Sequence, residues 1–330
     1  MMRLPEFTFV APRSIDEAVE ILASHAHGDA MLVAGGTDLL PNMKRRQQTP
    51  RTLVGLRRIA SLHDMANGSG LMLGAGLTLT DLVRDRRIAE RYAALHEAAA
   101  QIATPHLRNM GTLGGNLCLD TRCNYYDQNY EWRKAIDFCM KKDGATCWVA
   151  TSSPKCLAVS SSDTAPALIA LDAYVSLASV RGVRNLPLAE LYRNDGIRYL
   201  TRQPDEIVTA VRLPESDGWR STYRKLRRRG SFDFPVLSVA AAVQVGADGA
   251  VADARIVLGA VASRPVLADK AAAALVGEPL TDATIARAAD LAAEPARPMD
   301  NTDFTLLWRK RVTRECVTRA LTTLKAREAP

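Results

Sequence analysis

The sequence predicts an α+β protein built from three regions, at residues 1–58, 59–215 and 216–330. The length favours two to three domains, since an average domain has roughly 150 residues. In the first two regions, short apolar runs alternate with amphipathic stretches of helical period, which is typical of α/β units. In the last region the strand-like runs come first and the helical stretches later, which indicates a separate α+β domain.

The first region reads as a small β-α-β unit. Ser14 and Glu17 have the spacing of a capping box, in which Ser14 accepts from the Glu17 amide and Glu17 reaches back to the Ser14 amide. The apolar residues that follow recur at helical spacing, so we expect a helix over residues 14–23. We also expect strands at residues 31–34 and 52–56, with a helix ending near residue 46 between them.

The second region combines ordinary elements with two unusual stretches. A glycine-rich stretch occupies residues 108–116, and a cysteine-rich insertion occupies about 119–158. Outside these stretches, apolar periodicity predicts strands and helices in alternation. We expect strands at residues 71–74, 174–178 and 207–213, and helices near 80–86, 92–103 and 164–171.

The third region opens with Tyr223-Arg224-Lys225-Leu226. Apolar runs at 237–245 and 254–261 predict strands. Three helices are expected after them, near residues 267–276, 281–293 and 304–326. One face of the last helix carries an apolar stripe, so its cysteine is interpreted as a core residue. The stripe consists of Trp308, Val312, Cys316, Ala320 and Leu324.

Composition excludes several classes of protein. Hydrophobic residues make up 47% of the chain and charged residues 24%, which rules out a disordered chain, a collagen and a coiled-coil rod. No run of about 18 uncharged apolar residues is present, so we expect no membrane span. The N-terminus is too polar for a signal peptide, and we expect a cytoplasmic protein. The net charge is +7, but the sequence contains no nucleic-acid-binding motif. The basic runs are therefore interpreted as solvent-exposed faces.

The first glycine-rich loop, Ala34-Gly35-Gly36-Thr37-Asp38, follows a strand and opens a helix. Glycines let a backbone approach a ligand closely, and free N–H groups at such a turn favour a phosphate. The loop is neither the dinucleotide fingerprint G-x-G-x-x-G nor a P-loop, because Gly-Lys-Ser/Thr is absent. Taken alone, it is compatible with a simple tight turn between a strand and a helix.

A second glycine-rich loop favours ligand binding over a simple tight turn. Residues 111–116 read Gly-Thr-Leu-Gly-Gly-Asn, and three glycines in so short a segment are costly unless the backbone itself contacts something. The alternative is an irregular connection. Two such loops in one chain are the design expected for a diphosphate clamped from two sides, so we expect a dinucleotide-type cofactor.

The cysteines are clustered rather than spread. Five of the six fall between residues 118 and 156, which in a chain without secretion signals argues for metal or redox chemistry. Cys118 directly follows the second loop and is interpreted as a packing residue. The four that remain lack the close C-x₂₋₄-C pairs typical of structural zinc sites. These four are Cys123, Cys139, Cys147 and Cys156.

Three motifs together resemble a known family. Val33 to Leu39, the stretch Arg108 to Asn116, and Ser162-Asp163-Thr164-Ala165-Pro166-Ala167-Leu168 are similar in order and spacing to the FAD-binding medium subunits of the xanthine dehydrogenase/CO dehydrogenase family of molybdenum hydroxylases. The resemblance implies FAD held between two N-terminal α/β subdomains like those of the vanillyl-alcohol oxidases. It also implies a C-terminal domain like that of the CO dehydrogenase flavoproteins.

The resemblance also implies which residues contact FAD. The first loop and the strand before it would cradle the pyrophosphate, and the second loop would hold the isoalloxazine side. Asp163 would bind a polar group of the cofactor, and Lys225 would lie near the flavin or its phosphate. No residue of this chain would be catalytic toward substrate. The implied set is Met31, Leu32, Val33, Ala34, Gly35, Gly36, Thr37, Asp38, Thr78, Gly111, Thr112, Gly115, Asn116, Asp163 and Lys225.

The cysteine-rich insertion points to one group of proteins within this family. It is similar to the insertion in β subunits of 4-hydroxybenzoyl-CoA reductases, whose four cysteines hold a [4Fe–4S] cluster; here these would be Cys123, Cys139, Cys147 and Cys156. This implies an electron-transfer subunit that passes electrons from ferredoxin through the cluster and FAD. A small [2Fe–2S] partner and a large molybdopterin partner would complete a hetero-oligomer, for example a dimer of heterotrimers. The reaction would be reductive dehydroxylation to benzoyl-CoA.

Two other functions stay open. The chain could be the flavin subunit of another molybdenum hydroxylase, of the xanthine, nicotinate, aldehyde or CO type, that passes electrons to NAD or a quinone. In a different class, it could be a zinc-stapled protein that binds nucleic acid through its basic runs.

Overall fold

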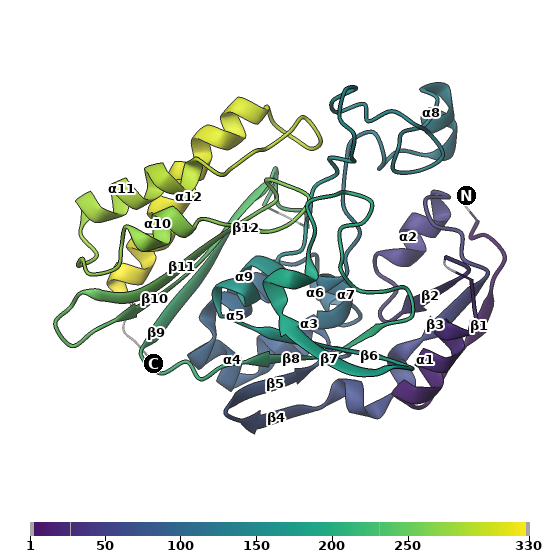
Figure 1. Ribbon diagram of the computed structural model, residues 1–330, viewed down its shortest axis with the longest axis horizontal. Helices are drawn as coiled ribbons and strands as arrows, with labels where there is room; N and C mark the ends of the chain where they lie inside the picture. Colours follow the sequence, from purple (N-terminus) through teal and green to yellow (C-terminus); the bar gives the residue numbers. More distant parts are fainter. Residues whose placement is uncertain (1–2, 27, 231, 328–330) are drawn as a thin grey trace.

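A computed structural model describes residues 3–26, 28–230 and 232–327. Three sheets follow one another along the chain, with strand orders β1-β3-β2, β4-β5-β8-β6-β7 and β12-β11-β10-β9. Figure 1 shows the first sheet at one end of the molecule and the third at the other, with a cysteine-rich excursion rising between them. This mixture of sheets and helices is the predicted α+β class.

The first sheet is parallel and small. Its strands are β1 (Thr8–Val10), β3 (Thr52–Gly55) and β2 (Ala30–Val33), of which β1 had no clear signal in the sequence. Helix α1 (Ile15–Ala23) buries its apolar face between this sheet and the second sheet, and Ser14 caps it as predicted. The capping box is incomplete, because the Glu17 carboxylate accepts from the amide of Arg13 at 2.7 Å instead of that of Ser14. Helix α2 (Leu39–Lys44) follows β2.

The second sheet is antiparallel and carries helices on one face. Its β4 and β7 were not predicted, because both are exposed along much of their length and so lack a run of apolar residues. Its strands are β4 (Met65–Gly68), β5 (Gly70–Gly74), β8 (Ile207–Leu213), β6 (Tyr174–Ser179) and β7 (Gly182–Pro187). Its helices are α3 (Leu79–Arg84), α4 (Arg86–Arg91), α5 (Ala93–Ala100), α6 (Pro105–Arg108), α7 (Leu113–Leu117) and α9 (Thr164–Ala170).

The third sheet is antiparallel, and three helices cover one of its faces. Helices α10 (Asp269–Ala273), α11 (Asp282–Ala293) and α12 (Leu306–Ala326) form that layer, in which Cys316 is partly buried. In the part of the chain that is described, no helix, not even the 21-residue α12, is apolar enough over a sufficient length to cross a bilayer. The strands are β9 (Trp219–Leu226), β10 (Leu237–Val245), β11 (Val251–Gly259) and β12 (Val266–Leu267).

The opposite face of the third sheet packs on α5 and α9 of the second unit. Tyr223, Ala240 and Val257 of this sheet belong to the same buried core as Leu95 and Leu168. The C-terminal region is therefore a separate sheet that shares a continuous core with the second unit, which fixes β9 close to the start of α9.

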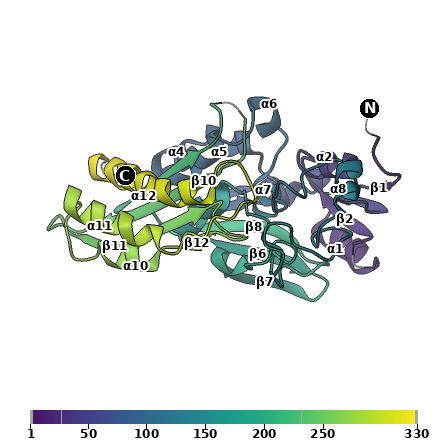
Figure 2. The same ribbon diagram turned by 90° about the horizontal axis from the view of Figure 1, so that it is seen from above.

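Residues 123–156 form a largely irregular excursion with one short helix, α8 (Tyr130–Ala135). Its base is closed by paired backbone hydrogen bonds between Arg122 and Val159, at 2.8 and 2.7 Å. The tip lies beside α2, because Arg133 donates to the Arg45 carbonyl and Gln47 donates to the Tyr126 carbonyl. Both views of the ribbon show α8 next to α2 (Figures 1 and 2). We call residues 123–156 the cysteine excursion.

Candidate functional site

One large cavity lies where the first sheet, the helices of the second unit and β9 meet. Its volume is about 780 Å³, which falls in the range of roughly 300–1,000 Å³ typical of ligand sites. All fifteen residues that the sequence predicted as cofactor contacts lie on its wall. They come from five separate segments of the chain, and the fold brings them together.

The first glycine-rich loop offers unused hydrogen-bond donors to this cavity. Within the described residues, the amides of Gly35, Gly36, Thr37 and Asp38 have no acceptor. Gly36 has a φ of +68°, a conformation that glycine adopts without strain. A row of free amides in such a turn is suited to the oxygens of an anion such as a diphosphate.

Gly35 has a further role that the sequence did not indicate. A Cβ at this position would lie 1.8 Å from the carbonyl oxygen of Met110 and 2.9 Å from the amide of Gly111. The glycine is therefore needed because the backbones of the two glycine-rich loops touch here. The expectation that it serves only the approach of a ligand was incomplete.

The second loop is mostly helical, not irregular. Thr112 caps helix α7, and Gly114, Gly115 and Asn116 lie within that helix. Their amides are used: Gly114 donates to the Ala75 carbonyl at 2.8 Å and Gly115 donates to the Thr112 hydroxyl at 3.1 Å. A Cβ on Gly114 would lie 2.9 Å from that of Ala75, so this glycine permits close packing of α7 on the segment after β5.

Thr78 and Asn116 hold the cavity wall in shape. Thr78 caps α3 in a complete capping box with Asp81, and its hydroxyl donates to that carboxylate at 2.7 Å. The Asn116 side-chain oxygen accepts from the hydroxyls of Ser162 and Thr164, at 2.9 and 2.7 Å, and from the Thr164 amide. This ties the second loop to the start of α9, which carries Asp163 at its N-cap.

Asp163 and Lys225 form a buried ion pair with an oxygen–nitrogen distance of 2.9 Å. Tyr223 also donates to Asp163, at 2.5 Å. Burial raises the pKa of Asp163, and the positive charge of Lys225 opposes that rise. Both residues line the cavity, but their charges chiefly satisfy each other across the junction between α9 and β9.

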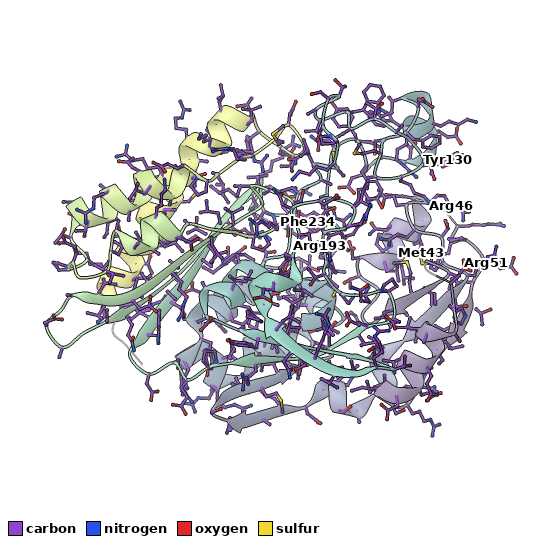
Figure 3. The ribbon with its side chains drawn as sticks, viewed as in Figure 1. Met43, Arg46, Arg51, Tyr130, Arg193 and Phe234 are labelled. Carbon is purple, nitrogen blue, oxygen red and sulfur yellow. The ribbon has the colours of Figure 1, made fainter. Side chains whose placement is uncertain are left out.

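Three further residues on the wall were missed by the sequence analysis. The buried Arg122 forms an ion pair with Asp38, and its Nε has no partner among the described residues. The hydroxyl of Ser161 is also buried without a partner. The Arg122 guanidinium lies over the ring of Phe234, with its central carbon 4.7 Å from the ring centroid. Figure 3 shows Phe234 near the middle of the molecule, where the C-terminal region meets the rest. No motif marks these residues, because their roles arise from contacts between distant segments.

The cavity fits a flavin dinucleotide in its chemistry. Free amides and a buried arginine lie at the first loop, where a diphosphate needs hydrogen-bond donors and positive charge. The orphaned donor atoms of Arg122 and Ser161 are buried groups that a bound polar ligand would satisfy. The rest of the wall includes apolar side chains such as Leu32, Ile102 and Ile207, which suit an aromatic ring system.

The four cysteines predicted as metal ligands are buried in the cysteine excursion. Cys123, Cys139 and Cys156 share a small core with Tyr126 and Ala158. The fourth, Cys147, lies close enough to Cys156 for its charge to raise the pKa of that thiol. All four are free thiols, and burial raises the pKa of Cys123 to about 12 and that of Cys156 to about 11.

The remaining cysteines lie elsewhere. Cys118 lines the large cavity beside α7, and Cys316 packs on the helical layer of the third sheet, as the sequence suggested. Among the residues that the structure describes, no three His, Cys, Asp or Glu side chains converge tightly enough to hold a metal ion. This arrangement does not support a zinc staple, which requires its ligands around one small ion.

Comparison with known proteins identifies the family. A model described as the FAD binding domain in molybdopterin dehydrogenase matches residues 5–216. A second, the CO dehydrogenase flavoprotein C-terminal domain, matches residues 221–324. Together these matches cover nearly the whole chain.

Individual relatives agree with the family models. The chain is 36% identical over 250 residues to the aldehyde oxidoreductase FAD-binding subunit PaoB of Escherichia coli strain K12, an alignment that covers 72% of this chain and 76% of that protein. It is 28% identical to the nicotinate dehydrogenase FAD-subunit of Eubacterium barkeri, over 86% of this chain and 83% of that protein.

Solved structures show the same fold. The structure of carbon monoxide dehydrogenase from Hydrogenophaga pseudoflava matches with a TM-score of 0.82 and 28% identity, over 99% of this chain and 100% of the matched one. Quinoline 2-oxidoreductase from Pseudomonas putida 86 matches with a TM-score of 0.77 and 26% identity, over 98% and 99%. The chain therefore belongs to the FAD-binding medium subunits of the molybdenum hydroxylase family.

Proposed function

We propose that this chain is the electron-transfer subunit of a molybdenum hydroxylase that oxidises an aldehyde or a related small molecule. The observation that carries the proposal is the single cavity that gathers every predicted FAD contact. The relative with 36% identity, named as an aldehyde oxidoreductase subunit, supports the substrate class. Substrate would react on a large molybdopterin partner, and a small [2Fe–2S] partner would connect the two subunits in a hetero-oligomer.

The residues of this chain would bind and orient FAD rather than act on substrate. FAD supplies the redox chemistry, since it accepts and passes on electrons. The free amides of Gly35 to Asp38 would hold the diphosphate, with the unpartnered Nε of Arg122 as a further donor. Thr112, Gly115 and Asn116 would fix the ring side through the rigid α7. The Asp163–Lys225 pair would place a polar, internally neutral surface beside the flavin.

We further propose that Cys123, Cys139, Cys147 and Cys156 ligate a [4Fe–4S] cluster. Four thiolates are the usual complement for such a cluster. A four-iron cluster is larger than a single ion and separates its ligands more widely. This suits four buried thiols, of which Cys123, Cys139 and Cys156 share a small core and Cys147 lies near Cys156. Binding would remove the thiol protons, because the ligand is the thiolate; burial raises the pKa of Cys123 and Cys156 and otherwise keeps these two thiols neutral.

The direction of electron flow distinguishes the proposed aldehyde-oxidising function from the alternative, 4-hydroxybenzoyl-CoA reductase. In that enzyme class electrons would enter from ferredoxin and leave toward molybdenum. The cysteine excursion is the feature that favours it, whereas the relatives compared above are named for aldehyde, nicotinate, CO and quinoline chemistry. Ferredoxin as a partner and a cytoplasmic location stay predictions.

Reduction of the flavin in the native complex tests the substrate class. The complex is purified with its partners, and flavin absorbance is followed without oxygen after addition of an aldehyde, nicotinate or 4-hydroxybenzoyl-CoA with a low-potential donor. Rapid bleaching by an aldehyde alone is expected. Turnover that requires the low-potential donor and yields benzoyl-CoA would reverse the proposed direction.

Single cysteine variants test the cluster. Cys139→Ser should lose iron while it keeps FAD, because the FAD cavity lies outside the cysteine excursion. Cys316→Ser is the matched control and should keep both, since Cys316 packs in the C-terminal layer. Iron at parent level in serine variants of all four excursion cysteines would refute the assignment, as would stoichiometric zinc without iron.

A further inference from the structure

A buried ion pair lies in the wall between the FAD cavity and the cysteine core. Asp120 and Lys141 are 2.8 Å apart, and their side chains are only 7% and 6% exposed. Asp120 precedes the excursion and Lys141 lies within it, two residues after Cys139. Neither the sequence motifs nor the FAD contacts described above account for this pair.

Every donor on Lys141 is used within the wall. Its ammonium group donates to Asp120 at 2.8 Å, to the Thr121 hydroxyl at 2.6 Å and to the Gly196 carbonyl at 2.6 Å. Asp120 also accepts from the hydroxyl of Tyr126, at 3.1 Å. A buried, fully hydrogen-bonded pair is held in one orientation, so its electric field has a fixed direction.

The two ends of the pair face different sites. The carboxylate end, Asp120, lines the FAD cavity, which Lys141 does not. The ammonium end binds Gly196, whose amide donates to the Cys156 carbonyl at 2.9 Å. A Cβ on Gly196 would lie 2.7 Å from the Cys156 sulfur, so this loop rests directly on that thiol.

We propose that the Asp120–Lys141 pair is a fixed dipole that biases electrons away from the flavin and toward the cluster. This inference rests on the proposed FAD and [4Fe–4S] sites. A positive charge near the cluster stabilises the additional electron there, and a negative charge near the flavin disfavours reduced flavin. One electron leaves one centre and enters the other, while the pair itself exchanges neither an electron nor a proton.

The pair is suited to this role because its field is weakly screened. Charges in the interior interact more strongly than charges in water, since the effective dielectric constant is lower. A stabilising role alone explains the pair poorly, because the desolvation of buried charges offsets much of their attraction. Another cation of this wall, Arg122, is paired with Asp38 and Asp127.

The test uses the native complex and two charge-removing variants. Lys141→Met removes the charge nearer the cluster, and Asp120→Asn removes the charge nearer the flavin. Both should move electrons toward the flavin, so the ratio of reduced cluster to reduced flavin should fall severalfold in half-reduced protein, measured by EPR and visible absorbance. Lys141→Arg should restore most of the parent ratio. Lys142→Met is the matched control, because its lysine is more exposed and pairs with Asp143, and it should leave the ratio unchanged.

The outcomes separate the inference from the proposed function. Parent protein without iron would refute the cluster itself. Variants with full iron and FAD but the parent ratio would overturn the dipole. Loss of iron from both Lys141→Met and Asp120→Asn would give the pair a purely structural role, which also overturns it. Iron and FAD contents are measured first, so each result is assigned without reference to turnover.

Discussion

The two glycine-rich loops look alike in sequence but do different things in the structure. In the loop of residues 34–38, the amides of Gly35 to Asp38 are unpaired within the described residues and face the cavity. In the loop of residues 111–116, most amides are consumed by the cap and turns of α7 and by Ala75 and Leu77. The first loop is therefore the candidate anion site, and the second is a scaffold that positions it.

The difference teaches that glycine is present for two separate reasons. It frees amides for a ligand in one loop and permits tight packing of protein on protein in the other. Gly35 serves both purposes, because it carries a free amide and touches the backbone of Met110. Substitutions at successive positions of the two loops therefore distinguish ligand binding from packing.

The largest effect is expected at the contact between the loops. Gly35→Ala places a methyl group 1.8 Å from the Met110 carbonyl oxygen, so the two loops must separate. We expect a loss of about 3 kcal/mol in the free energy of unfolding, together with loss of FAD. Denaturant unfolding and the flavin content after gel filtration measure both. Parent-level flavin and stability would show that the loops do not depend on this contact.

A smaller effect on FAD affinity is expected at Arg122. Arg122→Met removes the cation beside Asp38 and keeps much of the side-chain volume. We expect FAD to bind about tenfold more weakly, which corresponds to about 1.4 kcal/mol. Titration of the apoprotein with FAD measures the affinity. Arg184→Met, at an ion pair outside the cavity wall, is the control. Equal FAD affinity in both variants would remove Arg122 from the site.

In the second loop, we expect a substitution to affect stability more than FAD affinity. Gly114→Ala puts a Cβ 2.9 Å from that of Ala75, which crowds α7, although alanine favours the helix itself. The two effects partly cancel, so we expect a loss of about 1 kcal/mol in stability. FAD affinity should change less than in Arg122→Met. Thermal unfolding with and without FAD separates the two quantities, and a loss of FAD at unchanged stability would contradict the scaffold role.

The smallest effect is expected at Ser161. Its buried hydroxyl has no partner among the described residues, and such a group costs stability in the absence of a ligand. Ser161→Ala should leave the apoprotein as stable or slightly more stable, while FAD binds severalfold more weakly. Opposite signs in the two measurements would identify a ligand contact. A fall in both stability and affinity would indicate a structural role.

Local sequence patterns predicted those parts of the site that lie within one short segment of the chain. The strand–Gly-Gly–helix pattern located the first loop, and the capping residue Ser14 marked the start of α1. Short exposed strands such as β4 and β7 were missed, since they lack apolar periodicity. Helix α7 was missed because glycines at 114 and 115 disfavour a helix, which the cap at Thr112 and packing on Ala75 override.

The sequence by itself determined the fold class, the positions of both glycine-rich loops and the grouping of five cysteines in one segment, because each of these is encoded in neighbouring residues. Only the tertiary structure decided that Arg122 meets Asp38, that Asp163 pairs with Lys225, and that the Asp120–Lys141 pair separates the cavity from the cysteines. Such pairs join segments distant in the chain. Their meeting depends on how whole sheets and helices pack, which no local spacing records.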